Sequence, residues 1–191
     1  MTLEELVDIS YNYNQSELEK NKSEIGVLDD LALEQAIILA RKHNANETIV
    51  KIAMNLMDSK LPEASIEGMV KEHIPRGLEV AKKYLNQVND ASVEEKENIL
   101  ACIKEHHGAL KYSSIESEIC ANADCYKFLS AKGILAYASI LARRLSNLEK
   151  EWDKLEAKMD EKYNIVSMPE VKNELEETYL TFKKILKDAR K

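Results

Sequence analysis

The chain has few residues at which it can turn sharply, because its 191 residues include only five glycines and three prolines. Sheet proteins use both residue types in the turns between their many short strands. Their scarcity, together with 45% hydrophobic residues, favours long helices joined by short loops around a hydrophobic core. The sequence therefore predicts an all-α fold without a convincing strand.

Possible helix starts recur where a Ser/Thr-x-x-Glu segment precedes a stretch of helical hydrophobic periodicity. Such capping boxes satisfy backbone N–H groups at a helix start. Four segments have this pattern: Thr2–Glu5, Ser92–Glu95, Ser113–Glu116 and Ser167–Glu170. Together with the periodicity, they predict helices over residues 2–20, 30–43, 46–59, 63–87, 93–107, 114–130, 133–163 and 169–189.

The last two predicted helices carry hydrophobic residues at alternating spacings of three and four. This repeat is typical of helices that pack along one seam. With Pro169 in a first helical turn, we expect residues 131–191 to form an antiparallel hairpin and residues 1–130 to form a helical domain. The seam packs either within the chain or against a second copy, as a homodimer. Its members are Ile134, Ala138, Leu141, Leu145, Leu148, Trp152, Leu155, Met159, Val171, Leu175, Thr178, Phe182, Ile185 and Ala189.

Charge and composition exclude several classes of partner. The formal net charge of −7 argues against general nucleic-acid binding, since an acidic surface repels phosphates. No apolar run approaches the ~20 residues that span a membrane, and the N-terminus lacks the features of a signal peptide. We expect Cys102, Cys120 and Cys125, which lie in apolar helical stretches, to be buried thiols. These features favour a cytoplasmic protein without membrane contact.

The four histidines differ in their surroundings. His43 is expected at a helix C-terminus, where a cation is favourable, and therefore in a structural role. His106 and His107 border the hydrophobic face of a helix that Gly108 is expected to stop. Neutral imidazoles in such a place are suitable metal ligands, although a His-His pair is also compatible with a purely structural role.

Two aspartates lie in hydrophobic helical segments, where an unpaired carboxylate is costly to bury. Asp58 ends one such segment and Asp124 lies within another, and each is either exposed or paired with a charge or metal. Asp58, His73, His106-His107 and Asp124 fall on different predicted helices. Carboxylates and imidazoles that converge inside a helical bundle suit a divalent ion, which activates water and contacts phosphate oxygens.

The same segments, in this order, resemble the HD-domain metal-dependent phosphohydrolases over roughly residues 28–130. Each of four segments resembles one family motif. Ile52–Asp58 resembles the AxLLHD core, Glu72–Gly77 the EHxxxG segment, Ile103–His107 the IxxHH segment, and Ser114–Asp124 the segment with the final aspartate.

The resemblance implies an HD-domain-like helical bundle that hydrolyses a nucleotide or another small phosphate ester. It also implies a divalent metal cofactor, namely Mn, Fe, Ni or Mg, with Asp58 acting both as ligand and in catalysis. The implied metal ligands are Asp58, His73, His106, His107 and Asp124.

Two positions depart from the family pattern. Leu28 and Met57 stand where the family has histidines, and neither is a usual ligand of a hard divalent ion. Asp29 or Asp30 is a candidate substitute for the first. The departures leave three hypotheses: an active phosphohydrolase, a degenerate domain that binds a ligand or partner without turnover, and a structural helical protein. Candidate ligands that lie far apart would favour the last. Nearby cations that either meet phosphate or are merely solvated are Lys60, Lys71, Arg76 and Lys111.

Overall fold

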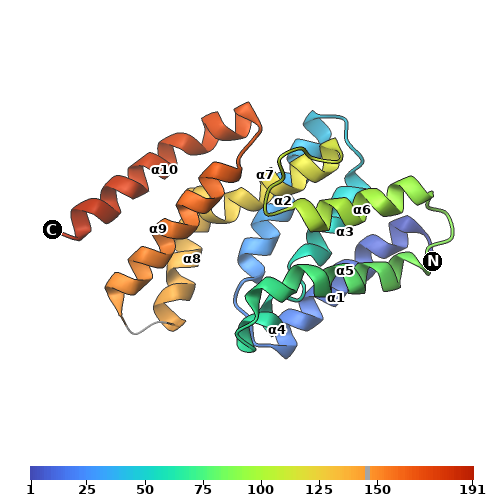
Figure 1. Cartoon of the computed structure of the whole chain (residues 1–191), viewed down its shortest axis with the longest axis horizontal. Coiled ribbons are helices and arrows are strands. Elements are labelled where there is room, and N and C mark those ends of the chain that lie inside the picture. Colours follow the sequence, from blue (N-terminus) through green and yellow to red (C-terminus); the bar gives the residue numbers. More distant parts are fainter. Residues whose placement is uncertain (145–146) are drawn as a thin grey trace.

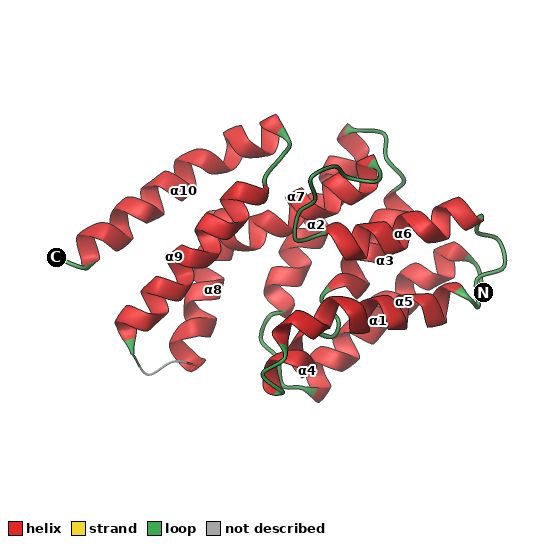
Figure 2. Cartoon of the chain, viewed as in Figure 1, coloured by secondary structure: helices red, strands yellow, loops and turns green. Residues whose placement is uncertain are grey.

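The computed structural model describes residues 1–144 and 147–191, and within these ranges it contains helices and no strand (Figure 1, Figure 2). The predicted all-α fold is confirmed. The elements are α1 (Leu3–Lys20), α2 (Gly26–Lys42), α3 (Glu47–Met57), α4 (Leu61–Ile66), the 3-10 turn η1 (Val70–Glu72), α5 (His73–Leu85), α6 (Val93–Glu105), α7 (Ile115–Leu129), α8 (Ala131–Arg144), α9 (Leu148–Ile165) and α10 (Pro169–Ala189).

Helices α3 and α7 form the centre of the bundle. From Ile49 to Met57, α3 buries every residue except Lys51, and α7 is buried along nearly its whole length. The helices α1, α2, α5 and α6 pack around α3, while α2, α6, α8, α9 and α10 pack around α7. Burial of each large aliphatic side chain contributes about 1.5–3 kcal/mol, so these two helices anchor the core.

Helices α9 and α10 form the expected antiparallel hairpin (Figure 1). Near the turn, the ring of Tyr163 stacks on that of Tyr179 with centroids 4.0 Å apart. Farther from the turn, Arg190 donates a hydrogen bond to Glu156 at 2.6 Å. Residues later in α10 therefore contact residues earlier in α9, which is the pattern of an antiparallel pair. The hairpin packs on α7 and shares one hydrophobic core with the N-terminal helices, while the division at residue 130 stays a prediction.

The prediction of one helix over residues 133–163 is wrong, because the chain forms α8 and α9 there. The side chain of Asn147 accepts a hydrogen bond from the backbone N–H of Lys150 at 2.9 Å, which makes Asn147 the N-cap of a new helix. Leu145 of the predicted seam lies outside the described residues. Leu155 and Met159 are buried in the core of this chain, and the homodimer stays a prediction.

The prediction of one helix over residues 63–87 is also wrong. Gly68 follows α4 with a φ of +72°, a conformation that favours glycine. Pro75 has no N–H and clashes with the preceding turn when it lies inside a helix. The chain therefore breaks and restarts at His73, with Pro75 in the first turn of α5. This break places His73 at the start of a helix.

Two of the four predicted capping boxes form, at Thr2 and at Ser92. At the third, Ser114 rather than Ser113 is the N-cap of α7. At the fourth, Met168 precedes α10 without a side-chain cap, because Ser167 bonds to side chains of α7 instead.

Side chains with an expected structural role lie where the sequence placed them. His43 ends α2, and its Nε2 lies 2.7 Å from a carboxylate oxygen of Glu170 on α10. The three cysteines are buried and unpaired. Among the described residues, every helix is too short or too polar to cross a membrane.

Gly133 allows the start of α8 to approach the end of α7. A Cβ at this position would lie 2.4 Å from the carbonyl oxygen of Tyr126 and 2.5 Å from that of Lys127. Backbone atoms must move to relieve this overlap. We expect Gly133→Ala to lower the free energy of unfolding by about 1–3 kcal/mol, as measured by urea denaturation.

Gly26→Ala is the matched control. Its added Cβ would meet only the flexible end of the Leu18 side chain, at 3.2 Å, so we expect a change within about 0.5 kcal/mol. Equal losses in the two variants would show that the contact at Gly133 is not the constraint.

Candidate metal centre

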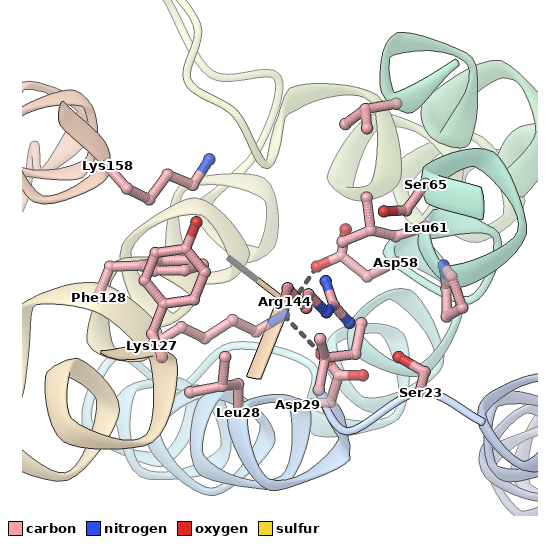
Figure 3. A pocket seen from close by; sticks show the side chains of 14 residues that line it. Ser23, Leu28, Asp29, Asp58, Leu61, Ser65, Lys127, Phe128, Arg144 and Lys158 are labelled. Carbon is pink, nitrogen blue, oxygen red and sulfur yellow. Dashed lines mark hydrogen bonds and ion pairs between the residues drawn. The ribbon is translucent and has the colours of Figure 1, made fainter. Parts of the chain in front are cut away.

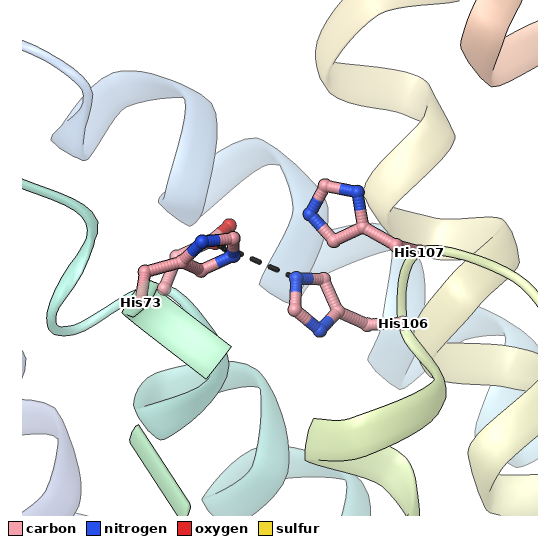
Figure 4. Close-up of side chains that lie close together, drawn as sticks. His73, His106 and His107 are labelled. Carbon is pink, nitrogen blue, oxygen red and sulfur yellow. Dashed lines mark ion pairs between the residues drawn. The ribbon is translucent and has the colours of Figure 1, made fainter. Parts of the chain in front are cut away.

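Four candidate ligands meet where helices end. Asp58 follows the last residue of α3, His73 begins α5, and His106 and His107 follow α6. One ligand atom from each residue lies within 4.8 Å of those of the others. Figure 4 shows the three imidazoles facing one another. We call these four residues the imidazole cluster.

The two buried histidines of the cluster have one ring nitrogen engaged and the other without a partner. Nδ1 of His73 lies 2.5 Å from the carbonyl oxygen of Val70, and Nδ1 of His106 lies 2.7 Å from that of Ile103. Because a carbonyl only accepts, these Nδ1 atoms carry protons, and in the neutral imidazole each Nε2 then presents a lone pair. Both Nε2 atoms are buried without a hydrogen-bond partner. Burying an acceptor in this way is costly.

The spacing of these atoms fits a divalent ion. The Nε2 atoms lie 3.4 and 3.5 Å from Oδ1 of Asp58, too far for strong hydrogen bonds. Two ligands of one tetrahedral ion lie about 3.3 Å apart. His107 is half-buried, and its burial lowers the pKa of the imidazole, which favours the neutral form that binds metals. The donor set is therefore suited to a metal.

Asp124, the fifth expected ligand, lies beside the cluster and binds two ammonium groups. Its Oδ2 accepts a hydrogen bond from Lys162 of α9 at 2.5 Å, and its Oδ1 lies 3.2 Å from Nζ of Lys127. The structure thus groups Asp58 with the three histidines and engages Asp124 with lysines.

Lys127 is the centre of a buried ion-pair network (Figure 3). Its Nζ donates hydrogen bonds to Asp29 at 2.8 Å and to Asp58 Oδ2 at 2.7 Å. Burial lowers the pKa of Lys127, but the nearby carboxylates outweigh it and raise this pKa well above its ordinary value. Burial raises the pKa of Asp58, but the ammonium group of Lys127 outweighs it and holds this pKa well below its ordinary value. At Asp29, in contrast, burial outweighs the effect of Lys127 and raises the pKa.

The structure separates the two candidate substitutes for the missing histidine. Asp29 is buried and contacts Lys127, whereas Asp30 is exposed. Leu28 and Met57 are buried, as is usual for apolar side chains.

A cavity of about 200 Å³ opens beside Asp58. Its charged lining residues are Lys127, Lys158 and Arg144 together with Asp29 and Asp58, so basic side chains outnumber acidic ones (Figure 3). A smaller cavity of about 80 Å³ is lined by His73 and His107, and both cavities are lined by Asp58 and Lys158. The imidazole cluster and the cationic cavity are therefore contiguous.

The cavity cations are not those that the sequence indicated. Lys60 is paired with Glu17 and Glu63, and Arg76 is paired with Glu67. Lys71 and Lys111 are exposed, and the lining of the cavity includes none of these four cations.

Comparison with known proteins identifies the fold. A scan against models of protein families finds no match, and a search of curated proteins finds none. Among solved structures, the chain resembles a predicted HD superfamily hydrolase from an uncultured Thermotogales bacterium, with a TM-score of 0.55 and 18% identity over 85% of each chain. It also resembles Bacillus subtilis YpgQ in complex with ADP, with a TM-score of 0.64 and 16% identity over 96% of this chain and 97% of YpgQ. The chain has an HD-domain fold.

The ion pair between Asp124 and Lys162 predicts a defined loss of stability in acid. Burial raises the pKa of Asp124, but Lys162 and Lys127 outweigh it and hold this pKa below its ordinary value. The stabilisation is therefore complete above the unfolded-state pKa of about 3.9 and is lost as pH falls toward the folded-state pKa. Asp124→Asn leaves buried ammonium groups without this carboxylate, so we expect it to lower stability by about 3–5 kcal/mol at neutral pH.

The test compares urea denaturation of the wild type and of Asp124→Asn as the pH is lowered. The stability difference should shrink below about pH 4, by at most ~1.4 kcal/mol per pH unit for one proton. A difference that stays constant down to about pH 2 would contradict the depressed pKa of Asp124.

Proposed function

We propose that this protein is a metal-dependent phosphohydrolase that acts on a nucleotide or another small phosphate ester. The observation that carries the proposal is the pair of buried, unpartnered Nε2 atoms of His73 and His106, which face Asp58 next to a cationic cavity. Both histidines lie within 3.5 Å of Asp58 rather than far apart, so the finding that would favour a purely structural protein is absent from this cluster.

Asp58, His73, His106 and His107 are the residues that would hold the ion. Mixed imidazole and carboxylate ligands favour Mn, Fe or Ni, and Mg is a weaker candidate because it prefers oxygen ligands. A bound ion supplies Lewis acidity and lowers the pKa of bound water. The carbonyl oxygens of Val70 and Ile103 fix the imidazole tautomers, so that both ligand atoms are oriented before an ion binds.

The cavity supports a phosphoryl group as the bound part of the substrate. Lys158 and Arg144 provide charges that complement phosphate oxygens. Phe128 and Tyr137 form an aromatic wall, with ring centroids 4.9 Å apart. The volume of about 200 Å³ is below the ~300–1,000 Å³ of pockets that enclose a whole drug-sized ligand. It therefore suits the phosphate end of a substrate whose remainder extends outward, and the ADP in the YpgQ structure supports a nucleotide.

A second candidate is a ligand-binding or regulatory domain without turnover. The observation that favours it is the neutralisation of Asp29, Asp58 and Asp124 by lysines, together with the apolar Leu28 and Met57. Under this alternative, the cavity binds a phosphorylated ligand and the imidazole cluster holds a structural ion or none.

Metal content tests the first candidate directly. We expect protein purified without chelators or a His tag to hold a divalent ion that His106→Ala loses, because the variant lacks one of the buried nitrogens. Mutation of residues that only hydrogen-bond to metal ligands weakens metal affinity ~10- to 100-fold. Loss of a ligand itself should weaken it at least as much. Elemental analysis measures the content, and His43→Gln is the control that should retain the ion.

Hydrolysis then separates the two candidates. Release of phosphate from nucleoside phosphates by the metal-loaded wild type, abolished in His106→Ala, supports the enzyme. A metal-loaded wild type that binds a nucleotide without hydrolysing it supports the binding domain. No ion after incubation with manganese, iron, nickel or magnesium would overturn the proposed metal site.

Lys158 is expected to bind the phosphate of the substrate. Its Nζ lies 5.2 Å from the ring centroid of Phe128 and donates a hydrogen bond to the exposed Glu161 at 2.8 Å, and the residue lines both cavities. Hydrogen bonds to charged groups contribute about 1.5–3 kcal/mol, so Lys158→Ala should weaken nucleotide binding roughly 10- to 100-fold, as measured by calorimetry. Lys154→Ala removes an exposed charge from the same helix and should change binding little. Equal effects would indicate only a general loss of positive charge.

A further inference from the structure

The two oxygens of Asp58 face two different positions. Oδ1 faces the unpartnered Nε2 atoms of His73 and His106, at 3.4 and 3.5 Å. Oδ2 accepts a hydrogen bond from Nζ of Lys127 at 2.7 Å. One carboxylate thus joins a cluster of potential metal-binding nitrogens to a position that already contains a cation.

This second position has the donor set of a divalent-cation site. Oxygens of Asp29, Asp58 and Asp124 lie 2.8, 2.7 and 3.2 Å from one point, which is Nζ of Lys127. Hard divalent ions bind carboxylate oxygens at about 2.0–2.6 Å, so a contraction of roughly 0.5 Å would give metal–oxygen distances. An ion and the ammonium group cannot occupy this point together.

The charges of the network agree with one built-in cation. Counted in their ionised forms, three carboxylates face two ammonium groups, those of Lys127 and Lys162, which leaves a single negative charge for an ion at the imidazole cluster to offset. Without Lys127, two negative charges would remain, the number that a divalent ion neutralises.

We propose that the ammonium group of Lys127 replaces a divalent cation between Asp29, Asp58 and Asp124, so that the wild-type protein binds a divalent ion only on the imidazole side of Asp58. The replacement itself stands on the ion pairs, and only the ion at the imidazoles rests on the proposed function.

Removal of the ammonium group should create a metal site. We expect Lys127→Ala to bind about one more Mn²⁺ per chain than the wild type, as measured by calorimetry and by elemental analysis after gel filtration. Mn²⁺ should also raise the melting temperature of the variant, since a ligand of the folded state stabilises it. A folded Lys127→Ala that gains no ion would overturn the replacement.

Two double variants locate the gained ion. Lys127→Ala with Asp29→Asn has one carboxylate fewer, and Mn²⁺ should bind it about tenfold more weakly or worse, because affinity follows the number of charged ligands. Lys127→Ala with His106→Ala should keep the gained ion. Loss of the gained ion through His106→Ala, with no effect of Asp29→Asn, would place the ion at the imidazoles and overturn the proposal.

The wild type provides an independent measurement. A wild type that holds two ions, one of which Asp29→Asn removes, would overturn the replacement. A wild type without any ion, combined with a gained ion in the Lys127→Ala/His106→Ala variant, would sink only the proposed metal site and support the replacement.

Instability of the variant is itself informative. Lys127→Ala leaves buried carboxylates unpaired, so it is refolded with Mn²⁺ and with EDTA. Lys127→Met, which keeps most of the length of the side chain without its charge, is refolded alongside it. Folding with Mn²⁺ alone, as seen by circular dichroism, supports the proposal. If both variants stay unfolded with Mn²⁺, the carboxylates do not accept an ion and the proposal fails.

Discussion

The buried ion pairs of Lys127 are the constraint on which the arrangement of the central helices depends. They join Asp29 of α2, Asp58 at the end of α3 and Asp124 of α7, and Lys162 extends the network to α9. A buried charge that loses its partner costs about 3–5 kcal/mol, whereas small shifts of apolar side chains cost less. Movement of any one of these helices would separate a buried charge from its partner. The network therefore fixes how the helices pack, and it also holds the charged groups of Asp29, Asp58 and Lys127 beside the cavity.

In this fold the helix faces form the hydrophobic core, whereas the helix ends supply the candidate metal ligands. The faces of α3 and α7 build the core, while the imidazole cluster comes from residues at the end of α3, the start of α5 and the end of α6. A helix end has free backbone groups and a changed chain direction, so ligands from different helices can converge there. The carbonyl oxygens of Val70 and Ile103 illustrate this, since each orients a histidine three residues later.

Much of the fold and of the imidazole cluster follows from local sequence patterns. Hydrophobic periodicity predicted the helices, but it missed the breaks at Gly68–Pro75 and at Asn147, where one proline and one capping side chain outweigh the periodicity. The sequence identified Asp124 because a carboxylate in an apolar helix needs a partner. The same reasoning applies to Lys127, three residues later in the same apolar run, yet its partners come from distant segments. Lys158 and Lys162 were missed because a long heptad helix explains lysines as solvated.

The hydrogen bond between Lys162 and Asp124 also has a consequence for the order in which the protein matures. A ribosome makes the chain from its N-terminus, so α7 is complete before α9 exists. Until residue 162 has emerged from the exit tunnel, Asp124 lacks an ammonium group that it has in the finished protein, and one side of α7 is not yet covered by α9. The earlier helices therefore emerge without the charge balance of the finished centre, and the arrival of α9 completes it during synthesis.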